Sequence, residues 1–415
     1  MRWLSTSAFY VRLLSRKRKR NEPLPMRRSI PLVWLTLLLP LLAAGEPTLP
    51  GVGEAMQTQV AASEVAGVVT LVTTKDEIIH WEATGLARLE PQVPMRPDDL
   101  FWLASTSKIF AGVAVLMLQD EGQLNVADPV AKYLPELAGL KTEAGDPAVI
   151  TITQLLSHMS GLADIDRTYY AGVTDLAGLM NLSLPLATLV SDPGQRWKYN
   201  NFEYDLAGRI VEVVSGKCYD AFLSERLLVP LGMVDTTFYP DEAQQGRLAA
   251  NYAKNRKTGA LDLRTTWSGL SIPVRGKFPP VPGGGLFSTA PDLAKFCRML
   301  LNRGSLDGRR YLSEESYALL TTIQTGQLPT AGRGWGLGPY ILRVAGDGGM
   351  VGLSAGSFGH PGALGTHLII DPEKGLGYVM LLHRSNLRDN FENEPMRLFV
   401  QAVTTALVQS HSEKP

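Results

Sequence analysis

The chain has 415 residues, of which 45% are hydrophobic and 19% are charged. This is an ordinary globular composition, and a chain of this length can bury a core that needs neither disulfides nor a metal. The charges balance formally at 40 Lys and Arg against 40 Asp and Glu, but residues 1–45 hold nine of the basic residues and one acidic residue, which leaves the remainder at −8. Nucleic-acid binding depends on neutralising phosphates, so this acidic body argues against a nucleic-acid partner.

Residues 1–45 are predicted to be an N-terminal extension and signal peptide. The basic triplet Met26-Arg27-Arg28 precedes an apolar run, Ile30 to Gly45, that ends in small residues, which is the order of a secretory signal. The alternative is a membrane anchor, but the run is shorter than the roughly 20 residues of a spanning helix. We therefore expect export to the bacterial periplasm or the medium, no stable membrane anchor, and a folded domain over residues 46–415.

Strand-like runs lie at both ends of this domain. Apolar and β-branched runs bounded by polar breaks or glycine predict strands at 67–74, 77–87, 340–346, 366–372 and 377–383. The middle of the chain has mainly helical spacing of its apolar residues. We therefore predict an α+β fold, with one antiparallel sheet from about residues 55–104 and 321–415 and an inserted all-helical domain from about 105 to 320.

One predicted helix of the middle carries reactive side chains. It begins at Ser105, ends at Gly122 and is apolar all round from Ile109 to Leu118, so we expect it to be buried. Lys108 follows Ser105 by three residues and lies on the same helix face. A serine hydroxyl becomes a nucleophile when a neighbouring base takes its proton, and a helix N-terminus offers backbone N–H groups to an oxyanion. Ser-x-x-Lys alone is also compatible with a helix cap and an outward-reaching lysine.

Further motifs follow this pair in order along the chain. They are a 152–162 stretch (ITQLLSHMSGL), the triplet Tyr199-Asn200-Asn201, a 282–296 stretch (PGGGLFSTAPDLAKF) and the triplet His360-Pro361-Gly362. Together with Ser-x-x-Lys they resemble the class C serine β-lactamases and the penicillin-binding-protein-like family, whose cousins share the same motif logic. The closest likeness is to the β-lactamase-like (family VIII) carboxylesterases. The resemblance runs from about residue 55 to 390.

This resemblance implies a β-lactamase/DD-peptidase-like fold, with an antiparallel sheet flanked by helices, and an acyl-enzyme mechanism without metal or other cofactor. Ser105 would be the nucleophile, and Lys108 and Tyr199 would move its proton; which of the two is the base in acylation stays open. The expected supporting groups are the backbone N–H groups of Ser105 and Ala363 as oxyanion hole and, for binding or support, Asn201, His360, Gly362 and Trp335. His158 and Ser160 are expected to be structural.

The third triplet bears on the substrate. A lysine at its first position would present a fixed positive charge to a substrate carboxylate, whereas His360 is mostly neutral near pH 7. The predicted activity is therefore carboxylesterase action on short-chain esters, with slow β-lactam hydrolysis beside it. The alternatives are a class C-type β-lactamase, a D-Ala-D-Ala carboxypeptidase or D-aminopeptidase, and a penicillin-binding module without turnover. The expected partner is a small ester, β-lactam or peptide; the oligomeric state and the choice between hydrolysis and acyl transfer stay open.

Two other patterns are not expected to form a site. Ser354 lies in a Gly-x-Ser-x-Gly sequence, the nucleophile motif of α/β-hydrolases, but no helix-forming segment follows it. Cys218 and Cys297 lie in segments with helical spacing. For these two cysteines, buried free thiols are favoured over a disulfide.

Overall fold

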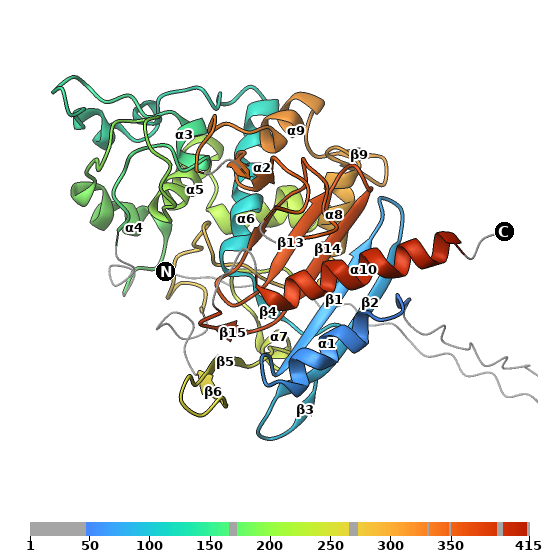
Figure 1. The fold of residues 1–415 in the computed structure, drawn as a ribbon. Helices are drawn as coiled ribbons and strands as arrows, with labels where there is room; N and C mark the ends of the chain where they lie inside the picture. The colour runs from blue at the N-terminus through green and yellow to red at the C-terminus, as the bar shows by residue number, and fades with distance from the viewer. Residues whose placement is uncertain are drawn as a thin grey trace, which may run out of the picture. The chain divides into compact units, whose positions relative to one another are not determined.

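The computed structural model describes residues 47–165, 172–264, 273–329, 332–347, 350–387 and 393–412, so the predicted signal peptide lies outside the described residues. Within these ranges the largest sheet is antiparallel and has eight strands in the order β10-β11-β12-β13-β14-β1-β2-β3. Its strands are β1 (Gly67–Thr73), β2 (Ile78–Arg88), β3 (Val93–Pro94), β10 (Arg333–Trp335), β11 (Tyr340–Leu342), β12 (Phe358–Pro361), β13 (His367–Asp371) and β14 (Leu376–Leu381). Both ends of the domain thus form one sheet (Figure 1), as predicted.

Strand β1 shows why the two ends meet. Its sequence GVVTLVT is rich in β-branched residues, and every residue is buried, so the strand needs a neighbour on each side. Val69 pairs with Leu381 of β14 and with Ala83 of β2. Successive side chains point to opposite faces: Val69 joins one hydrophobic cluster and Val68 another. The sheet is therefore the middle layer between two apolar layers.

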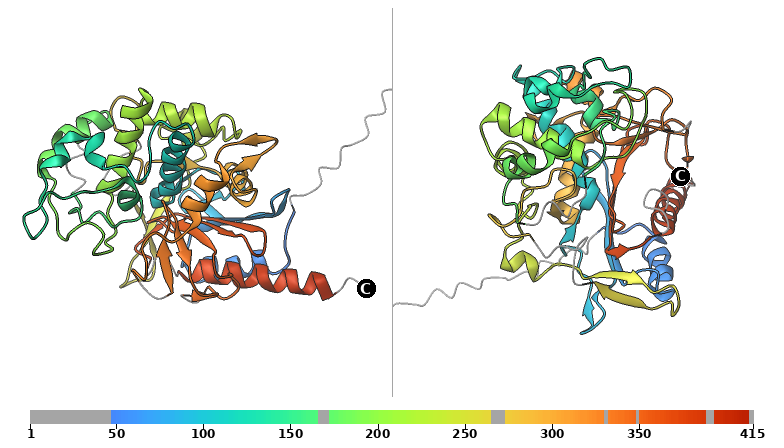
Figure 2. Two further views of the ribbon diagram at one scale, coloured as in Figure 1. Left: turned by 90° about the horizontal axis from the view of Figure 1, so that it is seen from above. Right: turned by 90° about the vertical axis from the view of Figure 1, so that its left-hand side faces the viewer.

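Helices cover both faces of the sheet. On one face α1 (Val52–Ala61) and α10 (Glu394–Ser412) pack against each other, as Figure 2 shows. On the other face α8 (Ala290–Leu301) crosses β1 and β14. The approach is close, because a Cβ at Gly377 would lie 2.8 Å from the Cβ of Cys297. Among the described residues, no helix combines the length and the apolar character needed to span a membrane.

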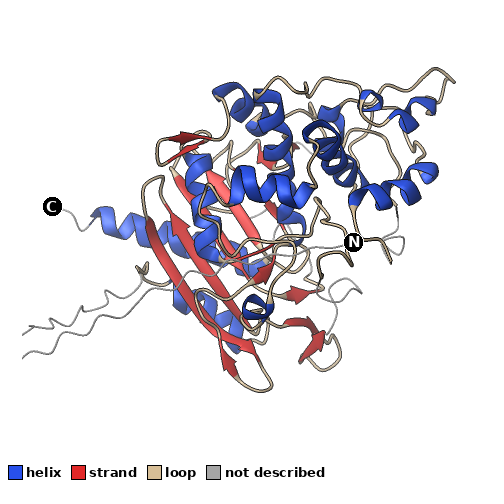
Figure 3. Cartoon of the chain, turned by 180° about the vertical axis from the view of Figure 1, so that it is seen from behind, coloured by secondary structure: helices blue, strands red, loops and turns tan. Residues whose placement is uncertain are grey.

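The middle of the chain is mainly, but not purely, helical (Figure 3). Its helices include α2 (Ser107–Asp120), α3 (Ile152–Leu156), α4 (Leu176–Ser183), α5 (Phe202–Ser215), α6 (Tyr219–Leu223), α7 (Glu242–Gln245), α8 and α9 (Glu314–Thr321). Short strands lie among them: β5 (Asn251–Lys254), β6 (Leu261–Arg264), β7 (Phe287–Ser288), β8 (Ser305–Leu306) and β9 (Arg309–Arg310). Strand β5 pairs with β15 (Arg384–Ser385), and β7 pairs with β4 (Phe101–Trp102). The prediction of an all-helical insertion missed these strands because β5 and β7 have partners that lie far away in the sequence.

Helix α2 lies inside the core. Every residue from Ser107 to Leu118 is buried, as expected for a helix that is apolar all round. A 3-10 turn, η1 (Ala104–Thr106), precedes the helix, which therefore starts two residues after the predicted start at Ser105. The helix ends before Gly122, whose φ of +68° is the left-handed conformation of a glycine stop signal.

Candidate active site

Ser105 lies in η1, where the chain passes from β4 to the buried helix α2. The residue before it, Ala104, has φ +48°, a left-handed conformation that costs a non-glycine residue about 1–3 kcal/mol. Neighbouring elements hold this turn, because Thr106 donates its hydroxyl hydrogen to His360 O of β12 (3.1 Å). The strained turn therefore sets Ser105 at the junction between the helical part and β12.

Lys108 is fully buried one turn after Ser105. Its Nζ donates hydrogen bonds to Gly283 O (2.6 Å), Asn201 Oδ1 (2.9 Å) and Ser105 Oγ (3.4 Å). The same nitrogen lies 4.9 Å from the centre of the Tyr199 ring. These neutral oxygens and this aromatic face offset the cost of burying an ammonium group. Side chains of the Ser-x-x-Lys and Tyr-x-Asn motifs thus converge on one nitrogen, which is placed to exchange a proton with Ser105.

Asn201 connects Lys108 to the start of helix α5. Its Nδ2 lies 3.4 Å from Oδ2 of Asp164, while its Oδ1 accepts from Lys108. Asp164 Oδ1 also accepts from the backbone N–H groups of Asn201 (3.1 Å) and Phe202 (3.2 Å), so it caps α5 from a distant segment. Because Asp164 is exposed, a negative charge lies on the solvent side of the Asn201–Lys108 pair.

His360, the first residue of the third triplet, is 1% exposed in β12. Its Nδ1–H donates to Pro361 O (2.7 Å), because a carbonyl oxygen can only accept. Burial and, to a smaller extent, the nearby Lys108 charge lower the pKa of His360 to about 3. The imidazole is therefore neutral near pH 7 and offers no fixed positive charge to a substrate.

Gly362 brings the end of β12 against the segment that leads into η1. A Cβ at this position would lie 2.3 Å from Leu103 O and 2.0 Å from Thr366 Oγ1, so only glycine permits this approach. Ala363 follows it and is exposed. The predicted second oxyanion donor thus comes directly after a very close contact between the β12 end and the Ser105 turn.

Trp335 lies behind the site rather than at its mouth. Its side chain is 1% exposed. Its ring centre lies 4.8 Å from that of Trp197, 6.1 Å from His360 and 6.4 Å from Tyr199. These distances are those of packed aromatic rings, so Trp335 supports Tyr199 and His360 from the core side.

Three residues near this cluster were not predicted as site residues. Gly283 lies in the 282–296 motif and acts through its backbone carbonyl, and the run of glycines from 283 to 285 indicates a close backbone approach. Asp164 and Glu203 are ordinary-looking acidic residues whose partners become clear only in the fold. Glu203 is 1% exposed and binds the side chains of His158 and Ser160. Of these two residues, both expected to be structural, His158 also lies next to Tyr199, with 4.5 Å between the ring centres.

Ser354 lacks the partners of an α/β-hydrolase nucleophile among the described residues. It lies in the loop before β12, and its N–H donates to Asp371 Oδ2 (2.9 Å). His383, which would have to be its base, accepts from Trp102 N (2.9 Å) and donates to Ala249 O (2.9 Å). Both imidazole nitrogens of His383 are therefore engaged with the backbone, away from Ser354.

The two cysteines are free thiols. Cys297 is buried in α8 as expected, whereas Cys218 is exposed because it lies in the turn that precedes α6. In the part of the chain that the structure describes, no three His, Cys, Asp or Glu side chains are grouped as metal ligands.

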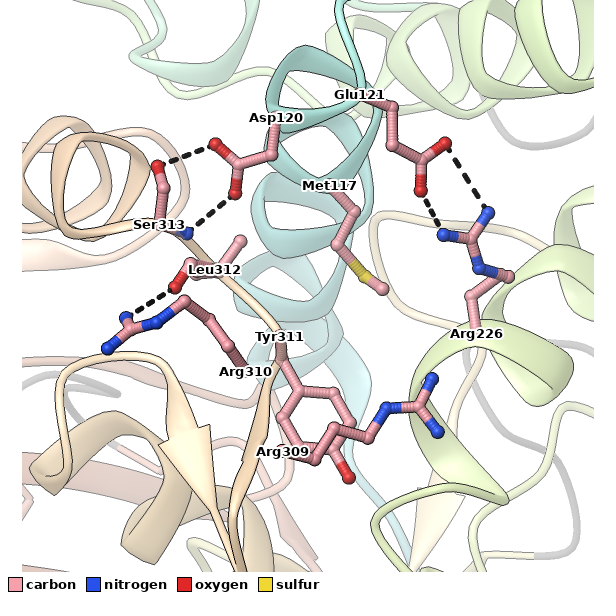
Figure 4. Close-up of a pocket in the computed structure, with 9 residues that line it drawn as sticks. All are labelled: Met117, Asp120, Glu121, Arg226, Arg309, Arg310, Tyr311, Leu312 and Ser313. Atoms are coloured by element: carbon pink, nitrogen blue, oxygen red, sulfur yellow. Dashed lines mark hydrogen bonds and ion pairs between the residues drawn. The ribbon is translucent and has the colours of Figure 1, made fainter.

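A cavity of about 230 Å³ lies at the other end of α2 (Figure 4). Its charged groups are mostly paired: Glu121 binds Arg226, and Asp120 accepts from Ser313 N (2.7 Å). This cavity and Ser105 lie at opposite ends of a helix about 20 Å long. The cavity is therefore not part of the Ser105 site.

Comparisons with known proteins cover nearly the whole domain. The family model described as beta-lactamase matches residues 52–402. An uncharacterized protein of Mycobacterium tuberculosis is 33% identical over 77% of this chain and 86% of its own length. Penicillin-binding protein 4 of Amycolatopsis lactamdurans is 30% identical over 74% of this chain and 78% of its own length. Esterase EstB of Burkholderia gladioli is 28% identical over 76% of this chain and 86% of its own length. The structure of EstCE1, described as a hydrolase with promiscuous acyltransferase activity, has a TM-score of 0.72 at 21% identity and covers 85% of this chain and 97% of its own, so the fold is shared.

Proposed function

Because this chain belongs to the β-lactamase family, we propose that it is a serine hydrolase that cleaves short-chain carboxylic esters through an acyl-enzyme on Ser105. The resemblance inferred from the motifs and the β-lactamase/DD-peptidase-like fold are both confirmed. Members of the family are hydrolases, esterases and peptidases, and the relatives named above include an esterase and a penicillin-binding protein. The choice among these reactions must therefore come from the site itself.

The observation that carries the choice of an ester is the neutral His360. A β-lactam or a peptide ending in D-alanine has a carboxylate, which a cationic group at this position would bind. Here the buried imidazole is uncharged near pH 7. The exposed Asp164 carboxylate lies on the solvent side of Asn201, the residue that accepts from Lys108. Both features favour an uncharged ester and disfavour an anionic substrate.

In the proposed reaction the Ser105 oxygen attacks the ester carbonyl carbon, and its proton passes to Lys108 or Tyr199. The carbonyl oxygen becomes an oxyanion that accepts hydrogen bonds from the N–H groups of Ser105 and Ala363. When the oxyanion collapses, the bond to the alkoxy oxygen breaks and Tyr199 returns a proton to the leaving alcohol. A water molecule then attacks the acyl-enzyme, which releases the acid and restores the Ser105 hydroxyl.

We also propose small uncharged esters as the main ligands, slow β-lactam turnover as a side activity, and export through the signal peptide. A class C-type β-lactamase, a D-Ala-D-Ala carboxypeptidase or a D-aminopeptidase is the second possibility for the same site. The relative named penicillin-binding protein 4 favours this second possibility.

The test compares two substrates, p-nitrophenyl butyrate and a chromogenic cephalosporin, with the mature protein. Ser105→Ala should abolish ester turnover, while the matched control Ser354→Ala, which removes the competing candidate, should retain it. Faster turnover of the cephalosporin than of the ester would instead favour the β-lactamase. Wild-type activity in Ser105→Ala would refute the mechanism.

A further inference from the structure

Two buried polar side chains next to the site have no part in the proposed reaction. His158 follows helix α3 and Glu203 lies in the first turn of α5, and each is 1% exposed. His158 Nδ1 lies 2.7 Å from Glu203 Oε2. Burying a carboxyl and an imidazole is costly unless their hydrogen bonds are satisfied, so this pair needs a reason.

His158 holds the chain on both sides of Tyr199. Its backbone oxygen accepts from the N–H of Lys198 (3.0 Å), and its ring Nδ1 accepts from the N–H of Asn200 (3.2 Å). The imidazole itself packs on the Tyr199 ring, with 4.5 Å between the ring centres. One residue thus holds the chain on both sides of Tyr199, Lys198 through its backbone oxygen and Asn200 through its ring, while the ring also packs directly on Tyr199.

Two contacts bear on where the protons lie. The N–H of Asn200 donates to Nδ1 of His158 (3.2 Å), which favours a lone pair on this nitrogen, the proton shared with Glu203 on the carboxyl group and the ring proton on Nε2. The other carboxyl oxygen, Oε1, accepts from the hydroxyl (2.5 Å) and the N–H (3.3 Å) of Ser160. Burial raises the pKa of Glu203 and lowers the pKa of His158, which favours the same neutral pair.

The neutral pair suits its neighbour Lys108, whose charge acts on both members. An ionised Glu203 in this dry setting would attract the Lys108 ammonium and hinder it from giving up a proton. A carboxylic acid orients His158 without adding this negative charge. His158 also has φ +61°, a conformation that asparagine and histidine tolerate better than most residues do.

We propose that His158 is a positioning residue for Tyr199, and that Glu203 holds it in place as a neutral carboxylic acid. This inference rests on the proposed function, because it assigns Tyr199 a place in the reaction. If His158 were purely structural, a change at His158 would lower kcat whether or not Tyr199 were present. If His158 positions Tyr199, the same change should lower kcat only while Tyr199 is present.

A double-mutant cycle tests this dependence. Asparagine can present an oxygen where Nδ1 lies and tolerates the positive φ, whereas the longer glutamine side chain cannot place an acceptor there. The two variants are therefore compared where their melting temperatures match. His158→Gln should lower kcat about 100-fold, the loss typical of a misplaced catalytic group, with KM within about threefold of wild type. His158→Asn should recover most of kcat. In a Tyr199→Phe background, His158→Gln should lower kcat by less than a further factor of about three, because the losses caused by two residues that act as a unit do not multiply.

Two results would overturn the proposal. One is that the kcat losses of His158→Gln and Tyr199→Phe multiply fully, and the other is that His158→Gln and His158→Asn lose kcat equally at unchanged melting temperature.

The acid form of Glu203 has its own pair of variants. Glu203→Gln, whose amide can donate to Nδ1 and accept from Ser160, should keep most of kcat, whereas Glu203→Met should lose about tenfold, as expected for a lost buried hydrogen bond. Equal losses in both would mean that a carboxylate is required.

A measurement without substrate separates this proposal from the proposed function. In ¹⁵N NMR spectra of histidine-labelled full-length mature protein at pH 7, the signals that disappear in His158→Asn should show an unprotonated Nδ1 and a protonated Nε2. Protonation of both nitrogens would overturn the neutral pair even if esters are hydrolysed. Failure of the wild type to turn over esters, with the expected spectrum, would instead refute the proposed function and leave the neutral pair in place.

Discussion

The substitution Gly208→Ala tests how a helix away from Ser105 shapes its surroundings. A Cβ at Gly208 in α5 would lie 2.2 Å from Pro282 Cγ and 3.2 Å from Leu176 Cδ1. Alanine should add about 1 kcal/mol of helix propensity, but overpacking of a buried site costs about 1–3 kcal/mol, and a proline ring cannot rotate away. Pro282 precedes Gly283, whose carbonyl accepts from Lys108 (2.6 Å). The rigid ring puts the cost at about 2–3 kcal/mol, the upper part of this range, so we expect a net loss of stability of about 1–2 kcal/mol and a displaced Lys108 partner.

Two assays read out this change. Thermal unfolding should show a melting temperature lower by a few degrees. The kcat for p-nitrophenyl butyrate should fall about 10- to 100-fold, because a shift of about 1 Å at a catalytic group is enough for such a loss. The matched control is Gly178→Ala in α4, where the nearest atom to a new Cβ is a side-chain oxygen of Asp175 at 3.3 Å. It should keep kcat and melt at or above the wild-type temperature, because it gains helix propensity without the clash. Unchanged melting temperature and kcat in Gly208→Ala would show that Gly208 and Pro282 are not in close contact.

Three further predictions concern groups outside the Ser105 turn. Burial lowers the pKa of His383 to about 4, so the unfolded chain binds more protons than the folded protein between pH 6.5 and 4, and stability falls as the pH drops through this window. The His383 contribution to the free energy of unfolding, measured with denaturant, should fall by about 2 kcal/mol between pH 7.5 and 5. In His383→Asn this part of the pH dependence should be absent. Burial raises the pKa of the Cys297 thiol while Cys218 is exposed, so a thiol reagent should titrate one cysteine in the native protein and two in denaturant; two fast native thiols would contradict the structure. Asp164→Asn keeps an acceptor for the α5 N–H groups but removes the charge, so kcat/KM for an ester with a trimethylammonium group should fall roughly threefold relative to its tert-butyl isostere; an unchanged ratio would exclude Asp164 from substrate selection.

Much of the fold could be predicted because its signals are local. The β-branched run of β1 and the apolar run of β14 predicted strands within one or two residues of the observed bounds, Gly67–Thr73 and Leu376–Leu381. The spacing of Ser105 and Lys108 predicted their contact, since residues three apart share a helix face. The motif order added Tyr199 and Asn201, and the structure brings both to the same lysine.

The remaining features depend on contacts that no local pattern reports. The pairing of β5 with β15 joins residues that are far apart in the chain. Gly283 contributes a backbone oxygen, which any residue could supply in principle. Glu203 and His158 each resemble an ordinary polar residue in the sequence, and their pairing appears only when α3 and α5 pack together. The burial of Trp335 likewise follows from the rings of Trp197 and Tyr199 that cover it.

Rapid-quench mass spectrometry of the mature protein mixed with p-nitrophenyl butyrate would detect the acyl-enzyme on Ser105 itself. We predict one butyryl group per chain, located on Ser105 by peptide mapping, that appears within a turnover and decays as the acid is released. The adduct should be absent from Ser105→Ala and present in Ser354→Ala. A butyryl group that stays on Ser105 would mean acylation without turnover. An adduct on another residue, or turnover by Ser105→Ala, would show that Ser105 is not the nucleophile.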